Sequence, residues 1–480
     1  MKIKNLILLP ALSMVLASCA SVNNVDSFSS ISKIDDPISA SSIDENHSDT
    51  NPISSELPES TFQFSVSGVN QLRSPEGLFD KPVNSEQWNS DSYKSFRDKM
   101  RAFSSKLSEI MVNREFSANG NFAFSPLSIE LCLGLAIRSA DGETRRELLS
   151  ALDMDYETFN TNYKIFFDLL YQNQKSYYGE LMAQLLLTNS IWIDNDVKLK
   201  DSGLDALRDD YYCYSYDVDF DGHNAEANQA IKEFINYNTK GLINPDLGLS
   251  PSTMFVLMNT LYIKDIWNED GHDLLYAPDT YQFTNSDGTK SSKKLLAGYA
   301  NSGKTLVTDD FTSFFTSTGN LYHIYFIKPN EGKNLKDVFT KEAIDYVLNH
   351  KNYIYRDEEK LERYYTQCYF PEYDVSCDID LSKAFKEDLD VNTLFGTNCN
   401  FSNLTDEIVF CNEFKQIAKL EVNKKGIEGA AVTYMAYAGA AGPDEWTDVY
   451  EQFVVDKEFG FVLTSNESVI FSGIVNNIDK

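Results

Sequence analysis

The sequence is short of basic residues relative to acidic ones. It has 42 Lys and Arg against 72 Asp and Glu, which gives a formal net charge of -30 at pH 7. A surplus of this sign repels nucleic acid and anionic membrane surfaces, and it favours solubility in an aqueous compartment. We therefore expect no nucleic-acid partner.

Histidine and paired cysteine are also scarce. The chain has only 5 histidines, and none lies in an HExxH or GxSxG setting. Its 7 cysteines form no CxxC pair and have no histidine at zinc spacing. We therefore expect no catalytic residue, no metal site, no cofactor and no enzyme, and we interpret most of the cysteines as buried thiols.

A phosphate-binding pattern is present, but its setting is wrong. Residues 298–305 read GYANSGKT and match GxxxxGK[ST]. That motif binds phosphate only when a strand leads into the loop and a helix N-terminus follows it. Because residues 306–311 read as a strand or turn, we expect no nucleotide site here.

The N-terminus has the pattern of an export signal. Two lysines precede an apolar stretch over residues 6–16, which is too short to cross a bilayer. The sequence Leu-Ala-Ser-Cys at residues 16–19 resembles the bacterial lipobox. We predict that residues 1–18 are a lipoprotein signal peptide and that Cys19 carries the lipid. The alternative is ordinary signal cleavage with an incidental cysteine.

Residues 19–60 are rich in Ser, Asp, Asn and Pro and show no helical or strand period. We predict a disordered tether, and a flexible chain of about 40 residues has an r.m.s. reach of about 35 Å. Residues 61–89 contain one alternating run and several turn signals, and we leave them unassigned. From these segments we predict an exported, extracytoplasmic domain that is lipid-anchored to the bacterial cell envelope.

The pattern is globular from residue 90 to residue 480. Apolar residues follow helical periods over residues 93–111, 128–137 and 225–239. Strand-like runs occupy residues 255–263, 322–327, 417–422, 459–463 and 469–475. Because helices and strands mix without a βαβ repeat, we predict one α+β domain. A solute-binding lipoprotein would show that repeat.

A colinear series of motifs in this domain resembles the serpin family. Residues 121–129 read NFAFSPLSI, as in the family's strand-to-helix signature. The later motifs are GETRRELL at 142–149, NTKGLI at 238–243, FVLMNTLYIK at 255–264 with Trp267, FPEY at 370–373, EVNKKG at 421–426, FGFVL at 459–463 and SGIV at 472–475. Their order and spacing hold over residues 90–480, the predicted serpin domain.

The resemblance implies a fold of three β-sheets and eight to nine helices, with an exposed reactive-centre loop near the C-terminus. In such inhibitors a peptidase is acylated when it cleaves the loop, and the loop then inserts into the main sheet as a new strand. The partner implied is an extracellular serine or cysteine peptidase, and the inhibitor is expected to be a monomer. The alternative is a non-inhibitory serpin that acts as a surface binding module.

The loop begins with a hinge whose side chains alternate. An inserted strand has one face over the core and one toward solvent. After Gly426, the odd-numbered positions carry apolar or small residues, and the only charge falls on an even-numbered position. The family usually has a small Thr or Ser where this chain has Ile427, so we expect slower entry. The predicted hinge residues are Gly426, Ile427, Glu428, Gly429, Ala430 and Ala431.

The resemblance places the scissile bond between Ala440 and Ala441. Small side chains there suit an elastase- or subtilisin-like pocket. Residues 440–453 are more numerous than usual, so the bond could also lie elsewhere between Tyr437 and Glu445.

Under the main sheet, the family uses a buried polar cluster to govern opening. Asn121, Ser125, Ser128 and Asn259 occupy the matching positions, and Gln416 replaces a common histidine. Because glutamine cannot gain charge at mildly acidic pH, we expect no pH-gated opening at this position. The alternative is that these residues are ordinary hydrogen-bonded core polar groups.

Overall fold

The structure is a computed structural model that describes residues 62–76, 83–117, 120–175, 181–267, 272–411, 414–428 and 446–479. These residues belong to one compact unit that begins at Phe62. The predicted signal peptide, Cys19, the tether, Gly429, Ala430, Ala431 and the candidate bond Ala440–Ala441 lie outside the described residues. Among the residues described, no helix is both long and apolar enough to span a membrane.

The described part contains ten α-helices, of which two have only four residues. They are α1 (Ser85–Trp88), α2 (Asp91–Glu115), α3 (Pro126–Ser139), α4 (Gly142–Ala151), α5 (Tyr156–Leu170), α6 (Asp201–Tyr211), α7 (Asn224–Asn238), α8 (Leu335–Val338), α9 (Lys341–Leu348) and α10 (Ser382–Asp388). Two 3-10 turns, η1 (His350–Asn352) and η2 (Thr393–Phe395), add to these. The eight longer helices agree with the eight to nine that were predicted.

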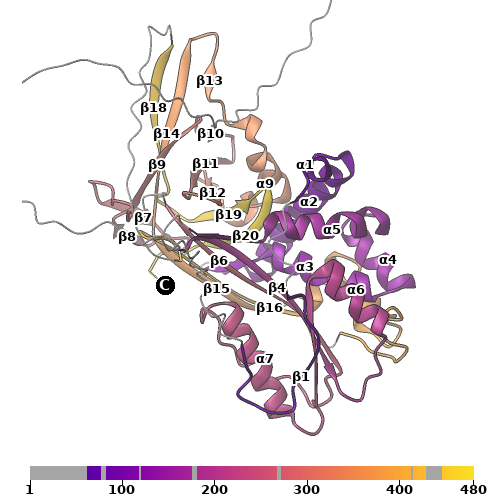
Figure 1. Ribbon diagram of the computed structural model, residues 1–480. Coiled ribbons are helices and arrows are strands. Elements are labelled where there is room, and N and C mark those ends of the chain that lie inside the picture. Colours follow the sequence, from indigo (N-terminus) through magenta and orange to yellow (C-terminus); the bar gives the residue numbers. More distant parts are fainter. Residues whose placement is uncertain are drawn as a thin grey trace, which may run out of the picture. The chain divides into compact units, whose positions relative to one another are not determined.

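The largest sheet has eight strands in the order β1-β5-β4-β6-β17-β16-β15, with β3 paired to β4 (Figure 1). Its strands are β1 (Asn70–Arg73), β3 (Gln172–Lys175), β4 (Leu181–Asp194), β5 (Cys213–Val218), β6 (Phe255–Ile266), β15 (Tyr373–Asp380), β16 (Lys415–Asn423) and β17 (Gly426–Ile427). We call it the main sheet.

Two further sheets and a two-stranded ribbon complete the strands. The six-stranded sheet contains β10 (Leu306–Val307), β11 (Phe311–Ser317), β12 (His323–Pro329), β19 (Phe459–Ser465), β20 (Ser468–Val475) and β2 (Phe122–Phe124). The four-stranded sheet contains β13 (Arg356–Asp357), β14 (Glu362–Phe370), β18 (Thr447–Val454) and β9 (Leu296–Ser302). The ribbon pairs β7 (Tyr281–Thr284) with β8 (Lys290–Lys293). Within the described part of the chain, helices and sheets thus mix without a βαβ repeat, and the predicted α+β class is confirmed.

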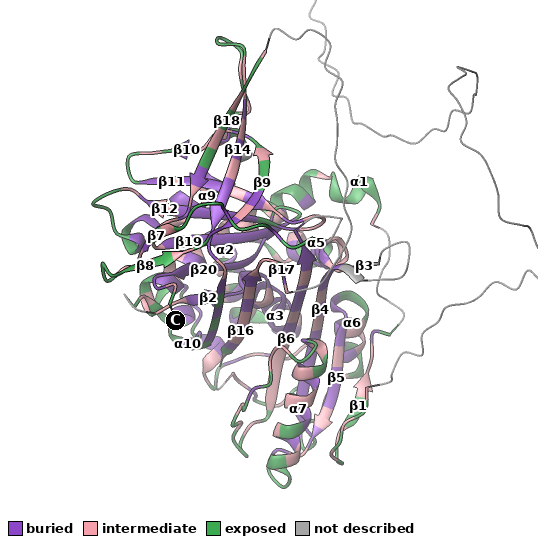
Figure 2. Ribbon diagram, turned by 90° about the vertical axis from the view of Figure 1, so that its left-hand side faces the viewer, coloured by how far each residue is buried: buried purple, intermediate pink, exposed green. Residues whose placement is uncertain are grey.

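Alternation along β4 explains how the main sheet is covered on both faces. Ile191 and Ile193 belong to the large core that includes α2, α3 and α5. Trp192 points the opposite way and packs with Phe234 of α7 and Tyr216 of β5. Buried residues therefore line both faces of the strand. Figure 2 colours much of the β4 ribbon as buried.

Some residues of segment 61–89, which the sequence analysis left unassigned, pack against the smaller core around Trp192 and Phe234. Phe62 and Phe64 contact Phe234 and Trp192, with ring centroids 6.3 and 5.8 Å apart, respectively. The next residues form β1, which pairs antiparallel with β5. Its Arg73 forms ion pairs of 2.6 and 2.7 Å with Asp201 and Asp205. This segment is therefore packed onto the edge of the main sheet and onto α7.

The helix and strand predictions are confirmed along the domain. The three predicted helices lie in α2, α3 and α7, and the five predicted strands coincide with β6, β12, β16, β19 and β20 to within three residues. Local signals account for the start of α3, since Ser125 caps it through a 3.1 Å bond from the Ser128 N–H and Pro126 lies in its first turn. Five of the cysteines are buried thiols, namely Cys132, Cys213, Cys368, Cys377 and Cys399.

Candidate functional site

The first hinge residues lie between two strands of the main sheet. Gly426 and Ile427 form β17, which pairs antiparallel with β6 on one side and with β16 on the other. The Ile427 side chain is fully buried, with 0% of its surface exposed. The hinge therefore enters the sheet here as the start of a central strand.

Gly426 is required at the point of entry. Its φ is +155°, a conformation that residues with a Cβ rarely adopt. A Cβ atom built there would lie 2.1 Å from the Asp265 carbonyl oxygen of β6. Any larger residue would push β17 out of its place beside β6.

The strand stops at Glu428. Its φ of +36° lies in the left-handed region, so the backbone turns away from the extended path of β17. Burial raises the pKa of its half-buried carboxyl group, and the nearby Glu421 raises it further, while Lys264 opposes the shift. One of its carboxylate oxygens, Oε2, is buried and lacks a hydrogen-bond partner among the described residues.

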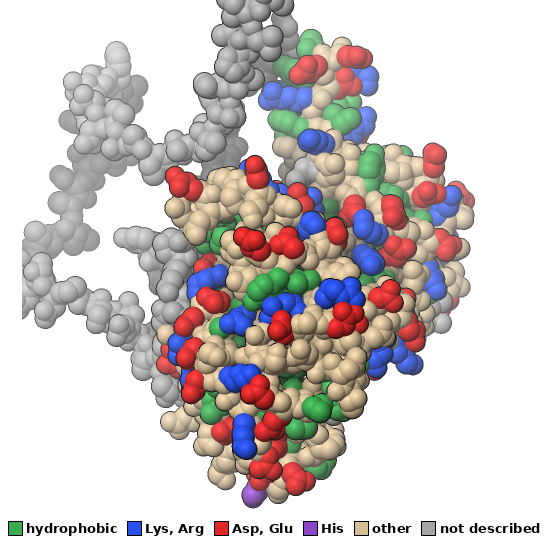
Figure 3. Space-filling model, turned by 90° about the vertical axis from the view of Figure 1, so that its right-hand side faces the viewer, with side chains coloured by type: hydrophobic (Ala, Val, Ile, Leu, Met, Phe, Trp, Pro, Cys, Tyr) green, Lys and Arg blue, Asp and Glu red, His purple; other side chains and the backbone are tan. Residues whose placement is uncertain are grey.

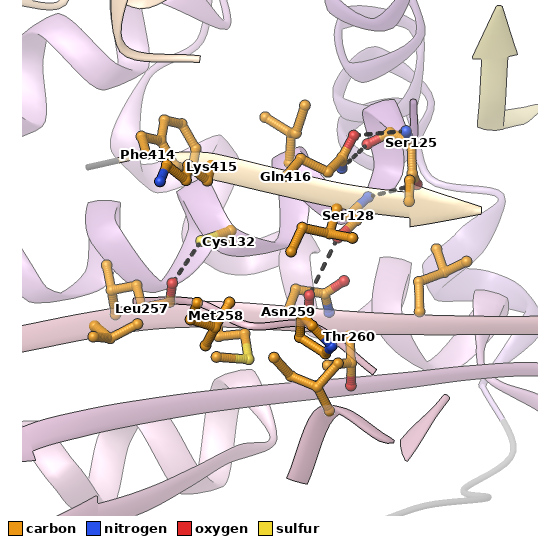
Figure 4. A pocket seen from close by; sticks show the side chains of 18 of the residues that line it. Ser125, Ser128, Cys132, Leu257, Met258, Asn259, Thr260, Phe414, Lys415 and Gln416 are labelled. Carbon is orange, nitrogen blue, oxygen red and sulfur yellow. Dashed lines mark hydrogen bonds between the residues drawn. The ribbon is translucent and has the colours of Figure 1, made fainter. Parts of the chain in front are cut away.

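Beyond Ile427 the neighbouring strands separate. No ladder joins β6 to β16 within the described residues, although each strand is paired along its other edge. A cavity of about 220 Å³ lies there and is lined by β6, β16 and α3 (Figure 4). A water molecule takes up about 30 Å³ of liquid, so the cavity has room for several groups of that size.

Four of the predicted cluster residues line this cavity together (Figure 4). The Ser125 N–H donates to Gln416 Oε1, and Gln416 Nε2 donates to the Ser125 carbonyl, both at 2.9 Å. Ser128 Oγ donates to the Asn259 carbonyl oxygen at 3.4 Å. The cluster thus connects both strands to α3 across the place where the sheet is open.

The network continues into residues that the sequence analysis missed. Asn259 Nδ2 donates to Asn189 Oδ1 at 2.9 Å, and Asn189 Nδ2 donates to the Tyr163 hydroxyl at 3.1 Å. Asn189 is fully buried in β4, where Thr188, Asn189 and Ser190 interrupt an otherwise largely apolar run, and this polar interruption was the available signal. Asn259 Oδ1 is buried and has no hydrogen-bond partner in the described part of the chain.

Asn121 lies apart from the cavity. Its Nδ2 donates to the Asn477 carbonyl oxygen at 2.7 Å. Its Oδ1 accepts from the N–H groups of Asn476 and Asn477, both at 2.9 Å. The residue therefore fixes the C-terminal segment, and among the described residues it forms no hydrogen bond with Ser125, Ser128, Asn259 or Gln416.

Asp265 is a second residue that the sequence did not single out. It lies opposite Ile427 on β6, and its carboxylate is fully buried. It accepts hydrogen bonds from Thr318 Oγ1 at 2.5 Å, Asn320 Nδ2 at 2.8 Å and the Leu321 N–H at 2.7 Å. Burial raises its pKa, and these hydrogen bonds work against the shift. The carboxylate connects the entry point to the turn between β11 and β12.

The phosphate-binding pattern lies between strands. Residues 298–302 belong to β9, and β10 follows at Leu306. Among the described residues, no helix N-terminus meets this loop, and Lys304 Nζ lies 4.6 Å from the centre of the Tyr364 ring. The geometry that makes such a motif a phosphate site is therefore missing.

Comparison with known proteins gives one consistent result. A family model described as "Serpin (serine protease inhibitor)" matches residues 98–478. Mouse neuroserpin is 24% identical over 372 residues, which cover 74% of this chain and 86% of the relative. A protein named "Serine protease inhibitor" from Cyanea capillata is 25% identical over 373 residues, which cover 75% and 93% of the two chains.

Solved structures agree in fold. The native state of the thermophilic protein tengpin superposes with a TM-score of 0.67 at 19% identity, covering 85% of this chain and all of the other. An Arabidopsis structure in a "native stressed conformation" superposes with a TM-score of 0.66 at 22% identity, covering 82% of this chain and all of the other.

Proposed function

The chain belongs to the serpin family, and we propose that it inhibits an endopeptidase by offering the loop after the hinge for cleavage and inserting it between β6 and β16. The predicted serpin fold is confirmed. The observation that carries the proposal is the open central position of the main sheet, which already holds Gly426 and Ile427.

The register of β17 defines where each further loop residue would lie after insertion. Ile427 pairs with Val422 and Asp265, and each step forward along the loop moves one residue back along both neighbours. Six steps would bring Thr433 beside Gln416 and Asn259. Four steps would bring Ala431 beside Ala418 and Leu261. All odd-numbered positions would face the cavity with Ile427.

This register supports insertion in two ways. The residues that would face the cavity carry no charge, so no carboxylate would be buried without a partner. The hydroxyl group of Thr433 would come next to Asn259 Oδ1, the buried acceptor that lacks a partner among the described residues. A hydrogen bond made there would contribute about 1 kcal/mol to the inserted state.

We propose that the target is an extracellular serine or cysteine endopeptidase that accepts small side chains, cleaving at Ala440–Ala441 or nearby between Tyr437 and Glu445. Names of relatives such as neuroserpin, alpha-1-antitrypsin and "Serine protease inhibitor" support peptidase inhibition as the general activity. A lipid on Cys19 and the tether of residues 19–60 would hold the monomeric inhibitor at the bacterial cell envelope.

The second candidate is a non-inhibitory serpin that acts as a binding module. The left-handed Glu428 favours it, because the strand ends there and the backbone must be rearranged before the strand can lengthen. The left-handed conformation of Glu428 is itself strained by about 1–3 kcal/mol, so its rotation to an extended conformation does not prevent insertion.

One experiment separates the two candidates. The purified domain is incubated with a panel of serine and cysteine peptidases, and the products are separated on a denaturing gel. Inhibition gives a covalent complex that resists denaturant, and mass spectrometry of the released C-terminal peptide locates the cleaved bond. Cleavage by several peptidases without any complex would contradict inhibition and favour the binding module.

A further inference from the structure

We propose that a row of aromatic side chains with one arginine on the four-stranded sheet is a docking surface for the peptidase that attacks the loop. The row consists of Trp446, Arg356, Tyr355, Tyr365 and Tyr450, and we call it the aromatic row. The inference rests on the proposed function for the identity of the occupant, and its own evidence is the geometry of this sheet.

The members of the row contact one another in sequence. The Arg356 guanidinium lies 5.6 Å from the ring centre of Trp446 and 5.2 Å from that of Tyr355. The rings of Tyr355 and Tyr365 meet edge to face at 5.8 Å, and Tyr365 stacks on Tyr450 at 5.5 Å. Three strands, β13, β14 and β18, therefore present one continuous surface.

The aromatic row lies on the solvent side of the sheet. Parallel pairing of β14 with β18 places Tyr365 directly beside Tyr450, and Tyr450 is 73% exposed. Side chains at the alternate positions of β14, such as Thr366 and Cys368, are fully buried on the other face. These strands extend away from the body of the domain, and their far end is largely exposed (Figures 1 and 2).

The composition of the row is that of a protein-binding surface. Tyrosine, tryptophan and arginine are the residues most enriched among those that dominate binding energy at interfaces. Arg356 forms no ion pair within the described residues, although the chain has a net charge of -30. Arg363 of the same face, by contrast, pairs with Asp448 at 2.7 Å. A partner that presents a carboxylate opposite Arg356 would complement this surface.

The occupant follows from continuity with the loop. Trp446 is five residues beyond Ala441, and five extended residues span at most about 18 Å. A peptidase domain of about 200 residues has a radius of gyration of about 16 Å, so a peptidase bound at Ala440–Ala441 would extend over β18. The loop around that bond offers mainly Ala and Gly, which provide little binding energy by themselves.

The experiment measures the second-order rate constant for loop cleavage in the intact domain, using elastase, subtilisin and the other peptidases of the panel. A synthetic peptide with the sequence of residues 429–446 is the reference substrate. Tyr450→Ala and Arg356→Ala are the test variants. Ile408→Ala removes a side chain that is 67% exposed and remote in sequence from the row, and serves as the control.

For the fastest-reacting peptidase, we expect cleavage of the wild-type domain to exceed cleavage of the peptide, and each test variant to lower the domain rate about tenfold. The Arg356→Ala effect should shrink at high salt, since it removes a charge contact. Unchanged thermal unfolding would show that the variants fold. Equal rates for wild type, test variants and control with every peptidase would overturn the proposal.

A failure of the proposed inhibition would give a different result from a failure of the docking proposal. Because the readout is cleavage, the docking surface is measured even if no covalent complex forms. Cleavage that is accelerated by the aromatic row without complex formation would support docking and contradict trapping.

Discussion

Glu130 carries a carboxyl group into the interior between α2 and α3. Its side chain is fully enclosed, and its hydrogen bond comes from Ser104 Oγ at 2.6 Å. Burial raises its pKa to about 8, and the serine bond only partly opposes this. The group is therefore largely protonated at neutral pH in the folded protein.

This shift predicts how stability depends on pH. An unfolded glutamate has a pKa near 4.3, so between about pH 4.5 and 8 the folded state holds a proton that the unfolded state has lost. The contribution of protonated Glu130 to the free energy of unfolding is complete below that pH window. It is lost as pH rises through the window, at about 1.4 kcal/mol per pH unit. Denaturant unfolding at several pH values should show this slope, and Glu130→Gln should remove it. An identical slope in both proteins would contradict the prediction.

The close approach of Gly426 to β6 gives a second prediction. Gly426→Ala should lower the free energy of unfolding by about 1–3 kcal/mol, because its Cβ would overlap the Asp265 carbonyl oxygen. Gly332→Ala is the matched control, since Gly332 also has a positive φ of 78° but no atom lies within 4 Å of its added Cβ. Denaturant unfolding measures both. An equal loss in the two variants would show that backbone strain alone is responsible.

At the scale of elements, sequence periodicity predicted most of the structure. The strand-like runs became β6, β12, β16, β19 and β20, and the helical periods became α2, α3 and α7. Such patterns depend on neighbours within a few residues. They could not reveal that β6 and β16 leave a position open between them, because those strands are far apart in sequence.

The element-scale prediction concerns the alternation of the inserted strand. Ala431→Glu would place a carboxylate against the cavity, while Ala430→Glu would place it toward solvent. We expect Ala431→Glu to be cleaved without forming a covalent complex, and Ala430→Glu to form one nearly as well as wild type. The complex-to-cleavage ratio on denaturing gels checks this. Equal behaviour of the two variants would exclude insertion in the register of β17.

At the scale of the whole molecule, insertion would fill the cavity and complete the main sheet. About ten new strand residues, with net hydrogen-bond contributions of about 1 kcal/mol each, should raise the melting temperature by at least about 10 °C after cleavage. Calorimetry before and after limited proteolysis measures this. The cleaved Ala431→Glu variant is the control, and no rise in the wild type would contradict insertion.

The distribution of charged side chains on the surface affects how strongly anionic lipids could attract the molecule. Basic and acidic side chains are interspersed over the face drawn in Figure 3. Many charged side chains of the described residues form ion pairs, such as Arg208 with Asp205 at 3.2 Å. This distribution provides no broad basic surface on that face for attraction to anionic lipids.

The lipid can be tested in cells. Cys19→Ser should move the full-length protein from the membrane fraction to the soluble or secreted fraction, because it removes the proposed acyl chains. Cell fractionation with immunoblotting measures this, and Cys132→Ser is the control because that thiol is buried in the domain. Retention of Cys19→Ser in the membrane fraction would contradict the anchor.

The sequence alone determined the class of fold, the family resemblance and the uncharged face of the hinge, since each depends on local periodicity or on ordered motifs. Only the tertiary structure decided that Asn121 fixes the C-terminus while Ser125, Ser128, Asn259 and Gln416 share a cavity. It also placed Asn189 beside Asn259 at the cavity and Asp265 beside the entry point, and it brought the aromatic row together. The physical reason is that these relations join segments far apart in the chain, and strand pairing fixes them only when the sheets form.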